Sequence, residues 1–203
     1  MTRRSLLVVL LATTAAAVAA GGYALYYGQP AADIATSDKA RIGGPFELTR
    51  HDGKRVSDKD FRGAYMLVFF GYTSCPDVCP AQLKVISAAL DRLGEKARRI
   101  QPVFITVDPE RDSPRVLARY VSAFHPRLVG LTGTTQEIAR VTRAYGVYHA
   151  RVKDSGQSKD YLMTHTTTAY LMAPDGRFVK HLSYTTDVEA MAAALSAALD
   201  RRG

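Results

Sequence analysis

The sequence predicts an α/β domain built on a mixed sheet, and three observations support this fold class. Two continuous apolar runs, 65–70 and 103–107, have the pattern of strands that are buried on both faces, as in parallel sheets. Each run is followed by a segment with helical periodicity. Two later β-prone runs, 167–173 and 177–184, flank a Pro-Asp-Gly turn and predict an antiparallel hairpin at one edge. Strands that alternate with helices imply helices on both faces of the sheet.

The bulk composition fits one globular domain with an N-terminal appendage. The chain has 203 residues, of which 47% are apolar, which suffices for one core but not for two. The formal charge of +8 favours binding to polyanions, but Lys and Arg are scattered among acidic residues. The densest basic cluster, Lys96, Arg98 and Arg99, lies at an expected helix end, where the helix dipole favours cations. We therefore expect no nucleic-acid partner.

Residues 1–28 predict a membrane anchor. Arg3 and Arg4 precede a stretch without charges, and residues 6–27 would span about 30 Å as a helix, which is enough to cross a bilayer. Because positive charge stays on the cytoplasmic side, the anchor would sit in the inner membrane with the domain in the periplasm. A cleaved signal peptide is the alternative, since Val18-Ala19-Ala20 fits the small-residue pattern before a cleavage point.

Residues 29–44 are small and polar, as in a linker, so we expect the folded domain to span residues 45–203. Its first element would be a hairpin formed by residues 46–51 and 54–56. The Asp52-Gly53 pair between these strands supplies the positive φ angles that a tight turn needs.

Start and stop signals then predict four helices. The signals are Gly94 as the cap of a helix after the cysteine loop, Ser113-Pro114 before a helix over 115–124, the capping box Thr134-x-x-Glu137 before a helix to about Tyr145, and Thr186-x-x-Glu189 before a helix to about Asp200. A short strand is expected over 128–131. The resulting order, β-α-β-α followed by β-β-α, is that of the thioredoxin-like fold.

Cys75 and Cys79 are the only cysteines in the chain, and they follow a buried strand at the start of a helix. The carboxyl ends of strands are where α/β folds place their sites, and amide groups at a helix N-terminus stabilise a thiolate. On a helical turn the two Cα atoms would be about 6 Å apart, which permits a disulfide or joint coordination of one ion. We expect a redox or metal role.

A purely structural disulfide is the weaker interpretation, because such a bridge would close a very short loop and remove little chain entropy. The spacing also separates this pair from two enzyme classes. Thioredoxin-type oxidoreductases use Cys-x-x-Cys, whereas three residues intervene here. A peroxiredoxin would have threonine where this chain has Tyr72.

A third ligand is expected, because a soft cation such as Cu(I) held by two thiolates commonly takes an imidazole or a thioether as well. Of the five histidines, His165 is the best candidate. It precedes a β-prone run in the part of a thioredoxin-like fold where the chain passes close to the cysteine loop. For the others we expect structural or solvated roles at turns, helix ends or strands: His51, His125, His149 and His181.

Four ordered segments share a pattern with one known family. They are the cysteine loop over 71–80, Val-Asp-Pro-Glu-Arg-Asp-Ser-Pro over 107–114, the segment from His165 to Leu171, and Pro-Asp-Gly-Arg over 174–177. Together they resemble the Sco/SenC family, the copper proteins that assist cytochrome c oxidase assembly. The similarity covers roughly residues 45–198, and the N-terminal anchor also matches. A short Cys-x-x-x-Cys alone would be weak evidence, whereas four segments in order are specific.

The resemblance implies that Cys75, Cys79 and His165 bind copper, as Cu(I), Cu(II) or both. It implies a metallochaperone that delivers copper to the copper-receiving subunit of cytochrome c oxidase at its binuclear centre, with other copper chaperones as further partners. A thiol:disulfide reductase, which would keep the oxidase cysteines reduced, and a redox sensor are the alternatives, since both would use the same residues.

Three positions depart from the family pattern. Ser74 stands where members often have histidine, Thr164 where aspartate commonly precedes the ligand histidine, and Ala173 where aspartate often precedes Pro-Asp-Gly. We expect the loss of a carboxylate beside His165 to loosen the imidazole, because such partners fix the tautomer and orientation of a ligand histidine.

Three acidic residues near these segments have structural interpretations. Asp77 lies between the cysteines, where it can tune the thiols, help a partner dock or cap the following helix, and we expect capping. For Asp108 and Asp112 we expect a role in shaping a strand-to-helix loop.

Overall fold

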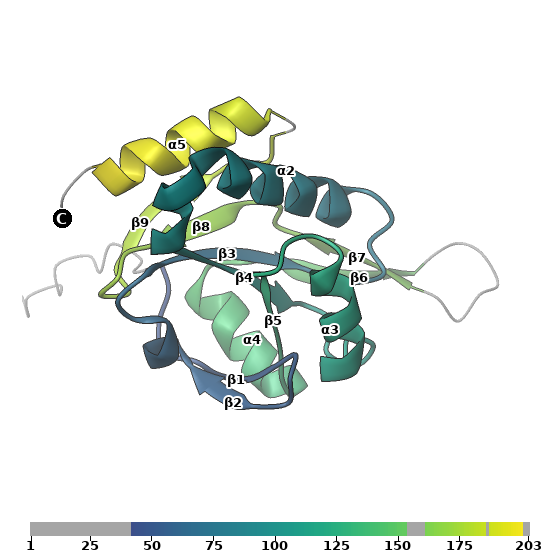
Figure 1. Ribbon diagram of the computed structural model, residues 1–203. Helices are drawn as coiled ribbons and strands as arrows, with labels where there is room; N and C mark the ends of the chain where they lie inside the picture. Colours follow the sequence, from purple (N-terminus) through teal and green to yellow (C-terminus); the bar gives the residue numbers. More distant parts are fainter. Residues whose placement is uncertain (1–41, 154–160, 186, 201–203) are drawn as a thin grey trace, which may run out of the picture. The chain divides into compact units, whose positions relative to one another are not determined.

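A mixed seven-stranded sheet forms the centre of the domain, in the order β2-β1-β5-β4-β3-β8-β9 (Figure 1). The computed structural model describes residues 42–153, 161–185 and 187–200. β3, β4 and β5 are parallel. β1 pairs antiparallel with β5 and β8 with β3, and the edge strands β2 and β9 pair antiparallel with β1 and β8. The strands are β1 Glu47–Arg50, β2 Arg55–Ser57, β3 Tyr65–Gly71, β4 Ile100–Thr106, β5 Val129–Thr132, β8 Ala169–Met172 and β9 Phe178–Leu182.

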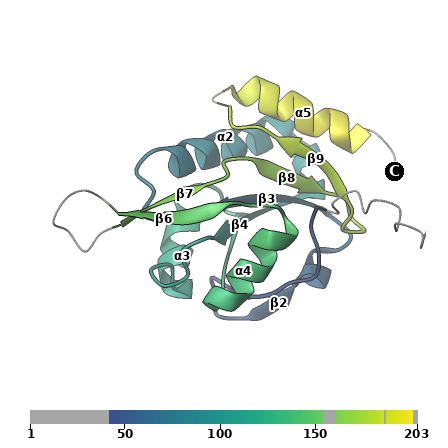
Figure 2. The same cartoon turned by 180° about the vertical axis from the view of Figure 1, so that it is seen from behind.

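Helices cover both faces of this sheet. α2 and α5 lie side by side on one face, and α3 and α4 lie on the other (Figures 1 and 2). The helices are α2 Val78–Leu93, α3 Pro114–Ser122, α4 Thr135–Ala144 and α5 Val188–Asp200, with short 3-10 helices η1 Asp58–Phe61 and η2 Gly94–Arg99. The mixed α/β architecture predicted from the sequence is therefore confirmed.

The two apolar runs form the buried centre of the sheet and fix the position of its carboxyl edge. Every residue of β3 is buried, and Phe69 of β3 lies opposite Phe104 of β4 with ring centroids 6.3 Å apart. Burial of each such side chain contributes about 1.5–3 kcal/mol. The parallel register pairs Gly71 with Thr106 at the ends of the two strands, so the loops that follow β3 and β4 leave the sheet next to each other.

The local signals explain where most elements begin and end. Gly53 and Gly94 have φ angles of 87° and 54°, which only glycine adopts without strain. Ser113 accepts a hydrogen bond from the amide of Val116, and the capping box at the start of α4 is formed. At the start of α5 the predicted Thr186 lies outside the described residues, and the carboxylate of Asp187 accepts the bond from the amide of Ala190.

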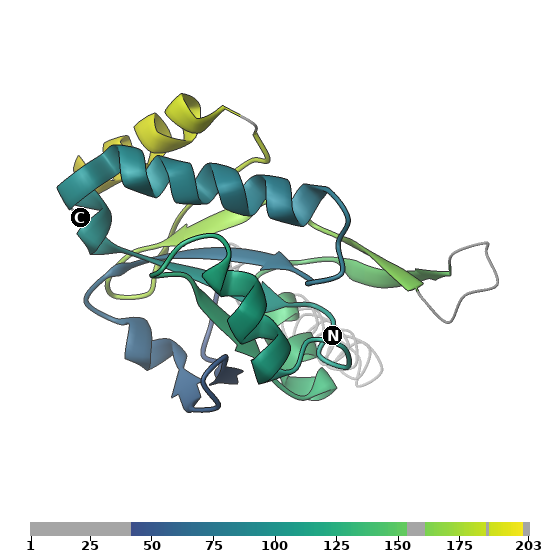
Figure 3. The ribbon, with the colours of Figure 1, turned by 45° about the vertical axis from the view of Figure 1, so that its right-hand side comes forward.

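A second, two-stranded sheet was not expected from the sequence. β6 (His149–Lys153) and β7 (Tyr161–His165) pair antiparallel and project beyond the main sheet (Figure 3). His165 therefore ends a strand of its own, before the predicted one. The pattern hides this hairpin because its exposed face carries Val152 and Leu162, whereas the opposite face carries several polar residues. The alternation of apolar and polar residues that would predict a strand with one buried face is therefore missing from this hairpin.

No helix in the described ranges is long and apolar enough to cross a membrane. The expected anchor over residues 1–28 and most of the linker over 29–44 lie outside these ranges.

Candidate metal centre

The cysteine loop connects β3 to α2 and places both thiols at the carboxyl edge of the sheet. The amide of Cys75 donates to the carbonyl of Tyr72 at 3.2 Å. Cys79 lies in the first turn of α2, where its own amide donates to the sulfur of Cys75 at 3.4 Å. Cys79 is fully buried and Cys75 is partly exposed. One sulfur is thus held inside the domain while the other faces solvent.

His165 reaches the same point from the end of β7. Its Nδ1 lies 2.9 Å from the carbonyl oxygen of Thr166. A carbonyl oxygen only accepts, so this nitrogen carries a proton, and in the neutral imidazole Nε2 then keeps its lone pair for a metal ion. The ring packs edge-on against Phe69 and Tyr72, with centroids 6.2 and 5.9 Å away. The backbone and two aromatic rings therefore orient the imidazole.

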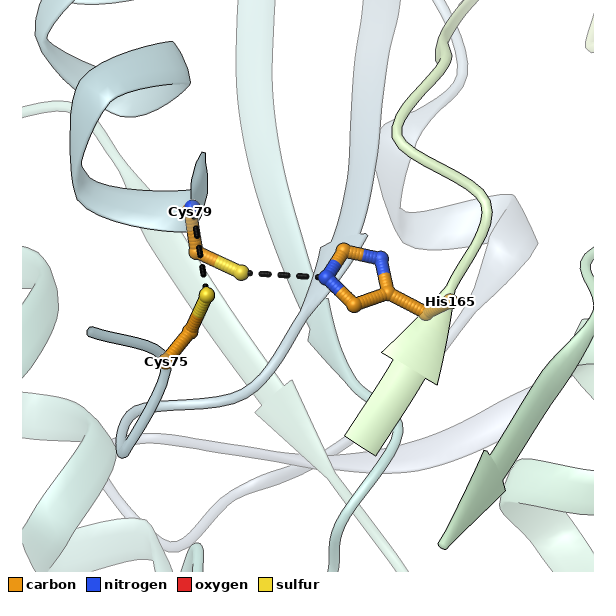
Figure 4. A group of neighbouring side chains, drawn as sticks. All are labelled: Cys75, Cys79 and His165. Carbon is orange, nitrogen blue, oxygen red and sulfur yellow. Dashed lines mark hydrogen bonds between the residues drawn. The ribbon is translucent and has the colours of Figure 1, made fainter. Parts of the chain in front are cut away.

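The three side chains converge although 86 residues separate Cys79 from His165. Nε2 of His165 lies 3.2 Å from Sγ of Cys79 (Figure 4). The two sulfurs and one imidazole nitrogen all lie within 4.8 Å of one another, which is close enough to hold one metal ion. The structure brings together the three residues that the sequence singled out.

The pKa values of the two thiols are shifted in opposite directions. The pKa of Cys75 is lowered to about 3, first by a hydrogen bond from Cys79 and then, against the cost of burial, by His165 and by the amides of Cys79 and Asp77. The pKa of Cys79 is raised by its hydrogen bond to Cys75 and by burial. The metal-free pair therefore holds one thiolate, on the exposed side, and one thiol.

Two contacts that the sequence did not reveal fix the cysteine loop. A β-carbon on Gly71 would lie only 2.9 Å from Sγ of Cys79, so glycine leaves the room that the sulfur occupies. The buried carboxylate of Asp112 accepts bonds from the amide and hydroxyl of Thr73, at 3.0 and 2.6 Å, and from the hydroxyl of Thr106, at 2.5 Å. Asp112 thus ties the loop to the end of β4, in line with the structural role expected for it.

Two expectations about individual side chains were wrong. Asp77 occupies the N-cap position of α2, but its exposed side chain makes no capping hydrogen bond. Thr164 is exposed and alternates with His165 along β7, so the two side chains leave opposite faces of the strand. The residue at 164 does not orient the imidazole here, because the carbonyl of Thr166 does so.

The other four histidines make different contacts, as expected. Among the described residues they lie outside the cluster of three donors. His51 accepts a bond from the amide of Gly130, and His125 faces Asp91 at 3.6 Å. The two remaining ones contact neighbouring elements: His149 near Thr142, and His181 against Tyr170 and Phe178.

Comparison with known proteins identifies the family. The family model described as SCO1/SenC matches residues 34–200. The chain belongs to the SCO1/SenC family. This SCO1/SenC chain is 44% identical over 157 residues to "Protein SCO1 homolog 1, mitochondrial" of Arabidopsis thaliana, covering 77% of this chain and 46% of that protein. It is also 44% identical over 146 residues to "Protein SCO1 homolog, mitochondrial" of Homo sapiens, covering 70% of this chain and 48% of that one. The chain thus spans about half the length of these curated relatives.

Solved structures of SCO1/SenC proteins share the fold. The crystal structure of Arabidopsis thaliana ScoI with copper bound matches with a TM-score of 0.75 and 41% identity, over 79% of this chain and 99% of that one. Bradyrhizobium japonicum ScoI with copper bound matches with a TM-score of 0.71 and 47% identity, over 77% and 98%. The mixed α/β, thioredoxin-like fold expected from the element order is confirmed by these likenesses.

Proposed function

We propose that this chain is a copper chaperone that carries one copper ion on Cys75, Cys79 and His165 and assists the assembly of the binuclear copper centre of cytochrome c oxidase. The observation that carries this proposal is the convergence of two sulfurs and one imidazole nitrogen within 4.8 Å. Thiolates favour Cu(I), and imidazole suits Cu(II) as well. Copper in two solved relatives supports the choice of metal.

The burial of the ligands suggests how copper leaves the site. Cys79 is buried, whereas Cys75 and His165 are both partly exposed. An incoming donor from a partner therefore approaches on the side of Cys75 and His165 and displaces these ligands first. The ion then passes by ligand exchange, without release as free metal. Oxidation of the two thiols to a disulfide would abolish binding, because the thiolate is the form that ligates metal.

The placement of the domain follows from the N-terminal sequence. We propose that residues 1–28 anchor the chain in the inner membrane, that residues 29–44 form a linker, and that residues 45–203 form the copper-binding domain in the periplasm. The copper-receiving subunit of the oxidase is the proposed partner, and other copper chaperones are the proposed donors.

A thiol:disulfide reductase is the second candidate, and the asymmetry of the two thiols favours it. The partly exposed Cys75, with its pKa held at about 3, is a thiolate at neutral pH, which is the form that attacks a disulfide. The buried Cys79 would then resolve the mixed disulfide. In this reaction His165 would be an accessory group.

Copper titration separates the two functions. The reduced protein is titrated with Cu(I) in competition with a chromophoric chelator, and with Cu(II), for the wild type, His165→Ala and the matched control His181→Ala. A chaperone loses most of its copper affinity in His165→Ala and keeps it in His181→Ala, because His181 is exposed and lies outside the donor cluster. Equal affinity in all three proteins, with unchanged thiol exchange rates, contradicts the chaperone and favours the reductase.

A further inference from the structure

The loop between β4 and α3 contacts both halves of the metal centre. It carries two carboxylates that are almost completely buried, Asp108 at 1% and Asp112 at 0% exposed. Asp112 holds the cysteine loop through Thr73. Asp108 faces the other way, toward the hairpin that carries His165.

Asp108 binds the hairpin through one tyrosine. The hydroxyl of Tyr161, the first residue of β7, donates to Oδ1 of Asp108 at 2.6 Å. The other carboxylate oxygen pairs with Nε of Arg111. Nη1 of Arg111 in turn donates to the backbone carbonyl of Tyr161 at 2.9 Å. Both the side chain and the main chain of Tyr161 are therefore bound to this loop.

The ring of Tyr161 is held as well. The guanidinium carbon of Arg111 lies 3.9 Å from the ring centroid, and that of Arg151, on β6, lies 4.6 Å from it. Each of these two cation–π contacts favours the observed position of the Tyr161 ring. Within the described residues, Nη2 of Arg111 is buried without a hydrogen-bond partner. The guanidinium also lies 5.7 Å from the ring centroid of Tyr72, so aromatic faces take the place of a further acceptor.

Tyr161 and His165 are coupled by the geometry of the strand. Side chains alternate along β7, and Leu162 and Thr164 are the exposed ones. Tyr161, Met163 and His165 therefore share the inward face. A shift of Tyr161 moves the whole short strand, and His165 ends that strand. The hairpin forms a sheet separate from the main one, so the ladder of the main sheet does not fix its position.

We propose that Asp108 and Tyr161 are positioning residues for His165, which hold the β6–β7 hairpin so that the imidazole faces the two sulfurs. The same loop holds the sulfurs through Asp112, so it sets the distance between the two halves of the site. This inference rests on the proposed function, because it names what positions the third copper ligand. Loss of the hydrogen bond between Tyr161 and Asp108 displaces the imidazole and leaves the two thiols in place.

The test is a double-mutant cycle on the full chain. Tyr161→Phe removes the hydroxyl that donates to Asp108 and keeps the ring between the two guanidinium groups. Tyr148→Phe is the matched control, since it makes the same chemical change at a residue beside the same hairpin that is 66% exposed. Cu(I) affinity is measured by chelator competition for each variant, with wild-type His165 and with His165→Ala. Amide hydrogen exchange of the metal-free proteins is the second readout.

We expect Tyr161→Phe to change Cu(I) affinity only in the protein that retains His165. Tyr161→Phe lowers Cu(I) affinity about tenfold when His165 is present, because partners that orient a ligand are worth roughly 10–100-fold. It has an effect below about twofold when His165 is already alanine, and Tyr148→Phe changes neither value. In the metal-free protein, Tyr161→Phe speeds exchange of the β7 amides and leaves the cysteine loop unchanged.

Three outcomes overturn the proposal. They are wild-type affinity in Tyr161→Phe, an equal loss in both backgrounds, and a general loss of exchange protection instead of one confined to the hairpin. The proposed function fails in a different way, through His165→Ala binding copper as tightly as the wild type. In that case the exchange data still report whether Tyr161 holds β7.

Discussion

Replacing Gly71 by alanine tests how tightly the fold is fitted to the buried sulfur. The new β-carbon would lie 2.9 Å from Sγ of Cys79 and 2.8 Å from the ring of Phe104. Relaxed contacts between such atoms lie at about 3.5–4.0 Å, so one neighbour must move by roughly half an ångström or more. Both neighbours are 0% exposed and cannot turn into solvent. Overpacking of this kind lowers the free energy of unfolding by about 1–3 kcal/mol, or Tm by about 2–12 °C.

The sulfur should move together with the core. Since loss of support around a metal ligand costs roughly 10–100-fold in affinity, we expect Gly71→Ala to weaken Cu(I) binding at least about tenfold. Chelator competition gives the affinity and thermal unfolding gives Tm. The control is Gly44→Ala, whose β-carbon would meet Ala144 at 3.5 Å, an ordinary contact. Unchanged Tm and affinity in Gly71→Ala would refute the close fit of Gly71 against Cys79.

Three further predictions concern the two thiols, the cysteine loop and two helix N-termini. Because the pKa of Cys75 is held at about 3, its thiolate is fully formed from about pH 5 to 8, so iodoacetamide should alkylate it at a constant rate over that range. Cys79, whose pKa is raised, should stay unmodified in peptide maps, and a rate that climbs toward pH 8.5 would contradict this. Thr73→Val should lower the free energy of unfolding by about 1–3 kcal/mol in urea, because it removes a donor to a buried carboxylate; an unchanged midpoint would count against that bond. Thr134→Ala should cost about 1 kcal/mol through loss of a cap, whereas Asp77→Ala should stay within about 0.5 kcal/mol, since Asp77 makes no capping bond.

The elements with strong periodic or capping signals could be predicted from the sequence. Local sequence determines the buried strands β3 and β4 and the helix caps at Ser113 and Thr134. Their residue patterns therefore predict these elements without knowledge of the rest of the fold. The order of these elements was enough for the fold, because short right-handed connections leave few alternatives.

The hairpin that carries His165 could not be predicted in this way. Its inward face carries His149, Arg151, Tyr161 and His165 beside one buried apolar residue, Met163, and the polar side chains on this face bind other polar groups as well as packing on the domain. The pattern of a half-buried strand is lost where the buried side is used for chemistry.

The supporting contacts of the site were also beyond the sequence. Asp112 lies 39 positions from Thr73, and Asp108 lies 53 from Tyr161. The carboxylates themselves could be singled out, but their partners depend on which loops the parallel register of β3 and β4 brings together. The same holds for Gly71. A side chain at this position would clash with the sulfur of Cys79, and the sequence does not show that these two residues are neighbours in space.

X-ray absorption at the copper edge of the Cu(I)-loaded, reduced protein tests the central claim most directly. The predicted spectrum shows two sulfur donors and one imidazole nitrogen, and the nitrogen contribution disappears in His165→Ala and persists in His181→Ala. A copper environment without two sulfurs, or one whose imidazole signal survives the loss of His165, would contradict a site built from Cys75, Cys79 and His165.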